Sequence, residues 1–158
     1  MDNLIISPFI SEKFKSGIFV DREKLRSTVR ELIRKYSVIV PSEDAPFWTL
    51  SGGNKQKFLL ARELFWGPRV IVVNNPTKGL DVAAAEYVRN ALMQEKASGK
   101  AILMISSDID EILDMSDQIA VMNRGKIMKL VPSANADLEE IAYLMTTSSE
   151  KQYAEREQ

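Results

Sequence analysis

The stretch Leu50-Ser51-Gly52-Gly53-Asn54-Lys55-Gln56-Lys57 decides how the rest of the chain is interpreted. It predicts a helix start, because Ser51 is a favoured N-cap residue and apolar residues then recur at helical spacing (Phe58, Ala61, Phe65). Glycines in the first turn let backbone N–H groups approach a ligand closely, and the positive end of the helix dipole favours an anion such as phosphate. Taken alone, the stretch is equally consistent with an ordinary capped helix.

The composition is that of one globular domain with a core. The chain has 158 residues, 45% of them hydrophobic, and a net charge of -1 from 21 basic and 22 acidic residues, so its charge does not suggest nucleic acid as a partner. It has no cysteine and no histidine, which excludes disulfides, thiolate metal sites and the usual general base. No apolar run approaches the roughly 18 residues of a spanning helix, and no signal peptide is visible. Any role at a membrane is therefore expected to come through a partner.

Patterns around this stretch predict alternating helices and strands. Asp21 is expected to cap an amphipathic helix that runs to about Tyr36, after a segment (residues 1–20) that is either a short helix or irregular. The helix that begins at Ser51 should end at Gly67-Pro68. The β-branched run at residues 70–73 predicts a strand covered on both faces, as in a parallel sheet.

The following elements extend this pattern. After a turn at residues 74–79 comes a predicted helix at 82–96, with an inward face that consists of Val82, Ala85, Val88 and Leu92. A second buried strand is expected at 101–105. Ser107 with Asp110 resembles a capping box that opens a short helix. Residues 118–130 predict a hairpin that turns at 123–126, and the last helix is expected near 138–145.

This order predicts an α/β fold with mostly parallel strands, flanking helices and a C-terminal hairpin. The fold is expected to be incomplete, because two buried parallel strands need neighbours and helices on both faces. No G-x-x-x-x-G-K-[ST] phosphate loop occurs in the sequence. An unpaired edge beside strands 70–73 and 101–105 is expected to invite dimerisation or aggregation of the isolated chain.

An ordered series of motifs resembles ATP-binding-cassette (ABC) ATPases. Residues 50–54 are similar to the signature motif of that family. At the family's spacing there follow Asn74-Asn75-Pro76-Thr77, Gly79-Leu80-Asp81, Ile105-Ser106-Ser107-Asp108 and the segment 115–127. Asn54 and the segment 108–112 look most like the second cassette of tandem-cassette ATPases, which serve importers of simple sugars or nucleosides. The resemblance covers nearly all of residues 3–146 and implies an incomplete P-loop NTPase fold, whose phosphate-loop half lies upstream.

The resemblance also implies a domain division, cofactors and partners. Residues 1–49 would be a helical subdomain lead-in, 50–147 the signature helix with the C-terminal part of the ATPase core, and 148–158 a polar tail. ATP and Mg²⁺ would serve the parent assembly, and none is expected for this chain alone. The implied partners are a second cassette in the same parent chain and transmembrane permease subunits. These would place the protein in the cytoplasm, peripheral to the inner face of the cell membrane.

Two positions depart from the family pattern in a way that bears on catalysis. The family's magnesium-holding Asp and catalytic Glu correspond here to Asn74 and Asn75. An uncharged amide cannot replace a carboxylate toward an attacking water, although Asn-Asn-Pro is also ordinary turn chemistry. Ser107 matches the position of the family's switch His. We therefore expect no catalytic residue and no metal ligand in this chain, and a site of its own that is hydrolytically inactive.

The signature keeps an implied role, since in this family two cassettes meet head to tail. The residues that would contact the phosphate or ribose of ATP held by the partner are Ser51, Gly52, Gly53 and Asn54. Asp81 resembles the family residue that bridges the two cassettes, and a simple N-cap role is an equally good interpretation. The leading hypothesis is that the chain completes the partner's site in trans. The alternative is a non-catalytic pseudo-ATPase module that docks on a partner cassette or a membrane subunit.

Other polar and aromatic residues are interpreted structurally. Lys57 is expected mainly to solvate its helix, although its charge could lie near a phosphate. The acidic residues at 108, 110 and 111 are typical of a helix start, and replacement of the lost carboxylate by one of them is the less favoured interpretation. Trp48 and Trp66 are expected to pack internally or to lie at an interface.

Overall fold

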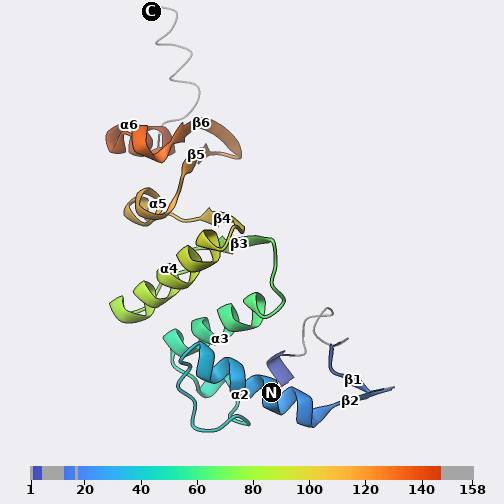
Figure 1. Ribbon diagram of the computed structural model, residues 1–158. Coiled ribbons are helices and arrows are strands. Elements are labelled where there is room, and N and C mark those ends of the chain that lie inside the picture. The colour runs from blue at the N-terminus through green and yellow to red at the C-terminus, as the bar shows by residue number, and fades with distance from the viewer. Residues whose placement is uncertain (1, 5–12, 17, 147–158) are drawn as a thin grey trace, which may run out of the picture. The chain divides into compact units, whose positions relative to one another are not determined.

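The computed structural model describes residues 2–4, 13–16 and 18–146, and it divides into an N-terminal unit up to Leu103 and a C-terminal unit from Met104 (Figure 1). The polar tail expected from residue 148 lies outside the described residues. The subdomain boundary expected between residues 49 and 50 stays a prediction.

The N-terminal unit begins with short elements that the sequence left undecided. A 3₁₀ turn, η1 (Asp2–Leu4), is followed by β1 (Lys15–Ser16), which pairs antiparallel with β2 (Phe19–Val20). Residues 5–12 of the expected lead-in lie outside the described residues. The side chains of Leu4 and Phe14 are fully buried, and the Phe14 ring stacks on Phe65 with 6.4 Å between centroids. This segment therefore contributes to the core of the unit.

Helix α2 (Arg22–Lys35) confirms the prediction made from Asp21 and the apolar spacing. The Asp21 side chain accepts a hydrogen bond of 2.9 Å from the backbone N–H of Lys24, so it satisfies a donor that the helix leaves unpaired. The predicted inward residues are buried or half-buried: Leu25, Val29, Leu32, Ile33 and Tyr36. After a 3₁₀ turn, η2 (Phe47–Thr49), the chain enters the signature helix.

Helix α3 (Gly52–Leu64) packs against α2 and against α4 (Val82–Ala97), and it is the centre of the unit. Its buried side chains are Phe58, Leu60, Ala61 and Leu64. The predicted end at Gly67 is confirmed: this residue adopts φ +65°, and its N–H donates to the carbonyl of Leu64 at 3.0 Å.

Strand β3 (Val70–Asn74) pairs with β4 (Ala101–Ile105), and α4 connects the two strands. Ile71 is buried, whereas Val70 and Val72 are 62% and 63% exposed and Leu103 is 58% exposed. The prediction that these strands are covered on both faces is therefore wrong for the described chain. The sequence correctly indicated apolar strands, but no described element of the N-terminal unit covers their second face.

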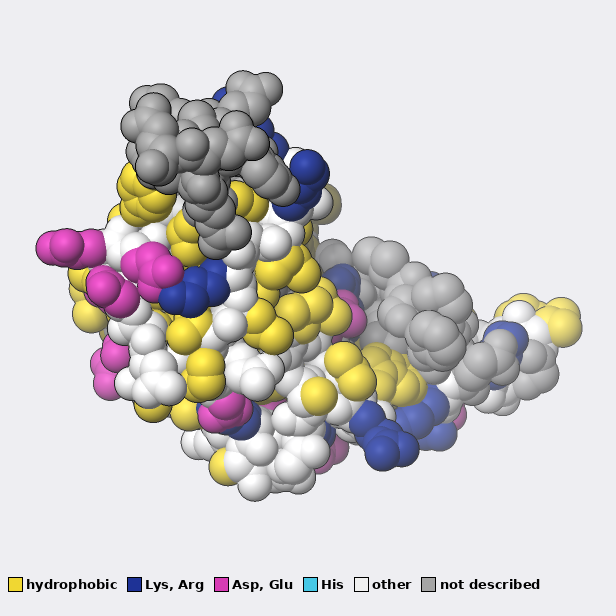
Figure 2. Space-filling model, turned by 90° about the horizontal axis from the view of Figure 1, so that it is seen from above, with side chains coloured by type: hydrophobic (Ala, Val, Ile, Leu, Met, Phe, Trp, Pro, Cys, Tyr) yellow, Lys and Arg dark blue, Asp and Glu magenta, His cyan; other side chains and the backbone are white. Residues whose placement is uncertain are grey.

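Exposed hydrophobic side chains are not confined to this sheet. They also occur at Ile18, Phe19, Ile39 and Trp48 in the N-terminal unit and at Met122, Ile127 and Leu130 in the C-terminal unit. Figure 2 shows hydrophobic side chains, in yellow, gathered between the charged groups of one face. Among the described residues, no helix has the length and apolar character that crossing a membrane would require.

The inward face of helix α4 differs from the prediction at Val82. Its buried residues are Ala84, Val88 and Leu92, spaced four apart along one stripe, while Val82 is 85% exposed. Val82 is the first residue of the helix, so the apolar spacing assigned it to the wrong side. The first inward position is Ala84, which faces Gly53 of α3.

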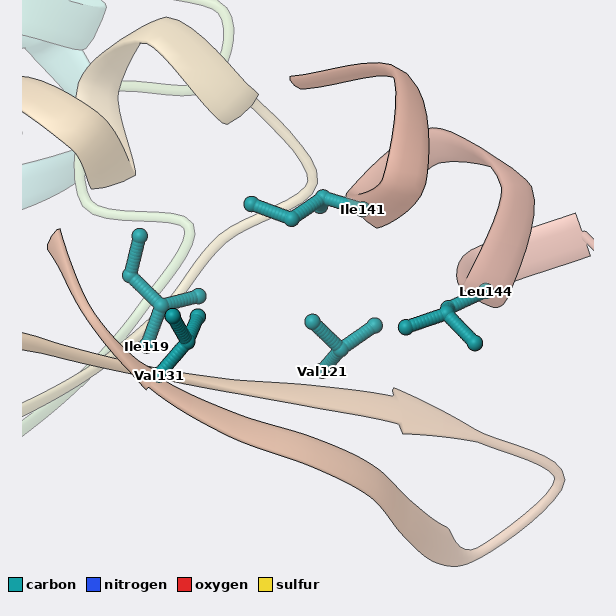
Figure 3. Close-up of a cluster of buried hydrophobic side chains, with 5 residues drawn as sticks. All are labelled: Ile119, Val121, Val131, Ile141 and Leu144. Carbon is teal, nitrogen blue, oxygen red and sulfur yellow. The ribbon is translucent and has the colours of Figure 1, made fainter. Parts of the chain in front are cut away.

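The C-terminal unit is a hairpin covered by helices. Strands β5 (Gln118–Asn123) and β6 (Lys126–Pro132) pair antiparallel, and α6 (Leu138–Thr146) follows a 3₁₀ turn, η3 (Ser133–Asn135). Figure 3 shows the buried cluster between hairpin and helix: Ile119, Val121, Val131, Ile141 and Leu144. Arg124 and Gly125 have φ of 47° and 77°, as a tight two-residue hairpin turn requires. The predicted hairpin and last helix are confirmed.

Helix α5 (Ile109–Met115) begins one residue later than the predicted capping box indicates. Its N-cap is Asp108, whose carboxylate accepts a hydrogen bond of 3.1 Å from the backbone N–H of Glu111. The assignment of Ser107 with Asp110 is therefore wrong. Asp108 and Glu111 have the same spacing, and an aspartate is as good a cap as a serine, so the sequence offered two registers one residue apart.

Candidate functional site

The site is built on the start of α3, where Ser51 caps the helix. The Ser51 hydroxyl oxygen accepts hydrogen bonds from the backbone N–H of Asn54 at 3.4 Å and from the Asn54 side-chain amide at 2.9 Å. A hydroxyl has two acceptor positions and one O–H donor. These two contacts use both acceptor positions, so the O–H group can still donate a hydrogen bond. Ser51 is exposed, and in the described part of the chain its O–H has no acceptor. The predicted cap is confirmed, and it keeps a free donor.

The two glycines after Ser51 have different surroundings. A Cβ atom placed on Gly52 would meet nothing within 4 Å, so this residue faces open space. A Cβ atom on Gly53 would lie 2.9 Å from the Cβ of Ala84 in α4, closer than real Cβ atoms approach. Gly53 is therefore needed for the close packing of α3 on α4. The first backbone N–H groups of the helix remain directed away from its own carbonyls, as at any helix start.

Asp81 lies beside the signature and caps α4. One carboxylate oxygen, Oδ1, accepts a hydrogen bond of 2.8 Å from the backbone N–H of Ala84. The other oxygen, Oδ2, would be 4.0 Å from a Cβ atom on Gly53. The N-cap interpretation is thus confirmed, and Asp81 is an exposed carboxylate at the signature glycines. The role of Asp81 in bridging two cassettes stays a prediction.

Asn74 and Asn75 lie at the end of β3 and are bonded to each other. The side-chain amide of Asn75 donates to Oδ1 of Asn74 at 2.9 Å. Asn75 has φ +47°, a left-handed conformation that asparagine adopts more readily than most residues. The carbonyl of Asn75 accepts a hydrogen bond from the N–H of Lys78 at 3.2 Å, which closes the turn. The turn chemistry that the sequence indicated is confirmed.

This pair does not fit a magnesium site. Magnesium in proteins is held by carboxylates, and neither side chain carries a charge. The Oδ1 oxygen of Asn74 accepts a hydrogen bond from Asn75, so one of its two lone pairs is already in use. Among the described residues, no group of three or more acidic side chains could hold a metal ion.

Gln56 makes a contact that the sequence pattern did not predict. Its side-chain amide donates a hydrogen bond of 3.0 Å to the carbonyl of Pro76, so it ties the second turn of α3 to the loop that follows Asn75. A glutamine that bonds to a backbone carbonyl 20 residues away leaves no periodic pattern in a sequence. The structure thus brings two groups of predicted residues onto one scaffold: the signature with Asp81, and the asparagine pair.

Ser107 and the acidic residues near it belong to the C-terminal unit. Ser107 is exposed and precedes the α5 cap. Glu111 is buried, with 1% exposure, and its Oε2 accepts a hydrogen bond from the Ser106 hydroxyl at 2.9 Å. Asp108 caps the helix, so the helix-start interpretation of this acidic cluster is confirmed for Asp108.

Lys57 and the tryptophans have well-defined neighbours. The Lys57 ammonium lies 4.5 Å from the ring centroid of Tyr87 and donates to the Ser37 carbonyl at 3.5 Å, so it is more than a solvating charge. Trp66 packs edge-on against Phe65 with 5.1 Å between centroids, which confirms internal packing. Trp48 is 78% exposed at the wall of a cavity of about 340 Å³, so it is not a packed residue. An interface role for Trp48 stays a prediction.

Comparison with known proteins identifies relatives that cover most of this chain. No family model matches. The chain is 38% identical over 144 residues to the nucleoside import ATP-binding protein NupA of Lactococcus lactis, with 91% of this chain and 28% of that protein covered. It is 36% identical to the glucose import ATP-binding protein TsgD13 of Haloferax volcanii (92% of this chain, 27% of that protein). It is 32% identical to the guanosine import ATP-binding protein NupO of Bacillus subtilis (96% and 30%).

Solved structures give the same fold. An inward-facing ABC transporter of the metal-chelate type matches with a TM-score of 0.64 and 18% identity, covering 75% of this chain and 47% of that one. The dimeric bacterial ABC transporter cassette MJ0796 matches with a TM-score of 0.61 and 22% identity, covering 75% and 51%. The chain thus spans less than a third of the length of these sequence relatives and about half of these structural neighbours. It is similar in sequence to part of these import ATP-binding proteins, and its fold is part of the ABC ATPase fold.

Proposed function

We propose that this chain works as part of the ATP-binding subunit of an importer for a simple sugar or a nucleoside. The relatives named above are import ATP-binding proteins for nucleosides, glucose and guanosine, and they align with nine-tenths or more of this chain. In such an assembly the subunit works with transmembrane permease subunits, in the cytoplasm at the inner face of the membrane. The chain would be the C-terminal part of the second of two cassettes in one parent chain.

The proposed contribution of this chain to ATP hydrolysis is made in trans, at the start of α3. The observation that carries it is the hydrogen bonding of Ser51, whose oxygen is occupied as an acceptor while its O–H donor is left for a ligand. Together with the first N–H groups of the helix, this donor suits a phosphate oxygen presented by the partner cassette. Bound ATP would supply the phosphoanhydride bond that is broken. Ser51 and the Gly53 N–H would orient its terminal phosphate and stabilise negative charge on it.

The chain's own asparagine pair would take no part in turnover. Asn74 and Asn75 bring no charge to activate a water molecule, and they are bonded to each other. The sequence has no phosphate-loop motif either. We therefore expect the 158-residue chain to bind no nucleotide by itself. Isothermal titration calorimetry with MgATP should show no heat of binding, and a micromolar dissociation constant would contradict this expectation.

The in-trans role is tested by Ser51→Arg in the complete ATPase, with Asn74 and Asn75 unchanged. The long cation would occupy the space in front of the helix and remove the hydroxyl donor, so ATPase activity should be abolished. A matched control is Asn90→Arg, which adds the same charge on the exposed side of α4. Full activity of the Ser51→Arg protein would show that the role in trans is wrong and would favour a pseudo-ATPase module that only docks on a partner cassette or membrane subunit.

A further inference from the structure

Asn54 connects the Ser51 hydroxyl to the end of another helix. Its side-chain Oδ1 accepts a hydrogen bond of 2.7 Å from the backbone N–H of Ile39, and its Nδ2 donates to the Ser51 oxygen at 2.9 Å. Both ends of one amide are thus used at the same time, on partners that lie 15 residues and 3 residues away in the sequence. The side chain is half-buried between them.

The orientation of this amide is fixed by chemistry. A backbone N–H can only donate, so the group that faces Ile39 must be the oxygen of the Asn54 side chain. The NH₂ group is then forced toward Ser51, and the Ser51 oxygen must accept. The Ser51 oxygen accepts hydrogen bonds from the Asn54 side chain and from the Asn54 backbone N–H. The Ser51 hydroxyl can therefore make a further hydrogen bond only by donating its proton. The Ile39 backbone therefore determines, through one amide, which way the Ser51 proton points.

The Ile39 backbone is itself held by the end of α2. Tyr36, the C-cap residue, is followed by Ser37 at φ +49°, and the N–H of Val38 donates to the Ile33 carbonyl at 2.9 Å. The Val38 side chain is 5% exposed, so this turn is anchored in the core of the N-terminal unit. A displacement of α2 would move the Ile39 N–H and, with it, the partner that orients Asn54.

We propose that Asn54 is a positioning residue: it holds the Ser51 hydroxyl as a hydrogen-bond donor and makes that orientation depend on the position of the α2 end. This inference rests on the proposed role of Ser51 toward a phosphate. It adds that the position of the α2 end regulates the ability of Ser51 to donate a hydrogen bond. It gives Asn54 a role through Ser51, in addition to any direct contact of Asn54 with nucleotide.

The critical variant is Asn54→Asp, which has nearly the same shape. A carboxylate still accepts from the Ile39 N–H, but it has no hydrogen to give to Ser51, so the Ser51 O–H must turn inward and donate to it. The donor is lost to the phosphate although the hydroxyl is still there. In Asn54→Ala the Ser51 hydroxyl loses its side-chain partner and rotates freely, so it can still donate outward. Asn54→Asp should therefore be more damaging than Asn54→Ala, the reverse of what loss of packing alone would give.

The experiment compares these variants and Ser51→Ala in the complete ATPase, by steady-state kinetics and by amide hydrogen exchange. We expect kcat to fall about 100-fold in Asn54→Asp and in Ser51→Ala, and about 10-fold in Asn54→Ala, on the scale of losing one preorganised donor. Exchange is measured by mass spectrometry on peptides that span residues 37–41. It should be about fivefold faster in Asn54→Ala, where the Ile39 N–H loses its acceptor, and unchanged in Asn54→Asp and Ser51→Ala.

The outcomes separate this inference from the proposed function. If Ser51→Arg abolishes activity while Asn54→Asp retains the kcat of the unsubstituted protein, the positioning role of Asn54 is wrong and the role of Ser51 stands. If exchange at residues 37–41 is the same in Asn54→Ala as in the unsubstituted protein, the link to α2 is wrong. If Ser51→Arg itself is fully active, the proposed function fails, and the exchange result alone then reports whether Asn54 holds the α2 end.

Discussion

Gly53 of α3 and Ala84 of α4 are packed so closely that a Cβ atom on Gly53 would lie 2.9 Å from the Cβ of Ala84. Both residues lie in the first turns of their helices, beside the Asp81 cap. Gly53 is thus required by helix packing. Its neighbour Gly52 faces open space and provides the natural comparison.

Gly53→Ala is expected to destabilise the chain by about 1–3 kcal/mol, because the added methyl group must push α3 away from α4. Gly52→Ala adds the same methyl group where nothing lies within 4 Å, so the free energy of unfolding should change by no more than about 0.5 kcal/mol. Urea denaturation of both variants measures the difference. Equal stabilities would show that the helices separate without cost.

The backbone at Asn75 sets a second expectation. Its φ of +47° costs an ordinary L-residue roughly 1–2 kcal/mol, and asparagine tolerates it better. Asn75→Glu, which places a carboxylate on this backbone, should therefore lower the free energy of unfolding by about 1 kcal/mol relative to Asn75→Gly. Both variants lose the hydrogen bond from the Asn75 side chain to Asn74. The difference between them therefore reports the free-energy cost of the positive φ. Thermal unfolding of the two variants gives the answer, and a glutamate variant as stable as the glycine variant would contradict it.

How well a feature could be predicted from the sequence depends on how far apart its interacting residues lie along the chain. The caps at Asp21, Ser51 and Asp81 were predictable because each bonds to an N–H three residues away. The α5 cap was missed by one residue because two acceptable cap registers overlap there. The exposed face of β3 could not be inferred, since an apolar run does not say whether a covering element is present.

Long-range polar contacts could not be predicted from the sequence for a related reason. The bond from Gln56 to the Pro76 carbonyl and the bond from the Ile39 N–H to Asn54 depend on how helices are placed, and they follow no period. The residues of the candidate site were therefore predictable as a motif, while their internal hydrogen bonding was not. That bonding is what distinguishes an ordinary capped helix from one whose hydroxyl is held as a donor.

Stability at high pH should depend on Tyr36. Burial raises the pKa of its phenol, and the nearby Glu95 carboxylate and Tyr87 act in the same direction. Between the ordinary tyrosine pKa of about 10 and the raised folded value, the unfolded chain binds fewer protons than the folded one, so stability falls as pH rises. Below about pH 10 this contribution is constant.

The matched variant for this effect is Tyr36→Phe, which removes the ionisable group and keeps the ring. Its free energy of unfolding should fall less steeply above about pH 10 than that of the unsubstituted chain. Tyr143→Phe, which removes an exposed phenol from the C-terminal unit, serves as the comparison variant. Guanidinium denaturation at a series of pH values measures all three. A slope that Tyr36→Phe leaves unchanged would assign the alkaline sensitivity to other groups.

The open face of β3 and β4 leads to a prediction about association. Val70, Val72 and Leu103 are all more than half exposed on neighbouring strands, and a two-stranded sheet is too small to be stable without further cover. Contact between two such faces would remove apolar area from water, at about 25 cal/mol per Å². The isolated 158-residue chain should therefore self-associate as its concentration rises.

Val72→Lys combined with Leu103→Thr should abolish this association, because a lysine on an exposed strand opposes pairing and the threonine keeps β-propensity. Val82→Thr is the control: it removes a side chain that is 85% exposed but lies on α4, away from the sheet, so association should persist. Static light scattering over a concentration series measures the mass of each protein. A double variant that associates as strongly as the control would place the contact elsewhere on the surface, and an unsubstituted chain that stays monomeric at high concentration would show that the open face is tolerated in water.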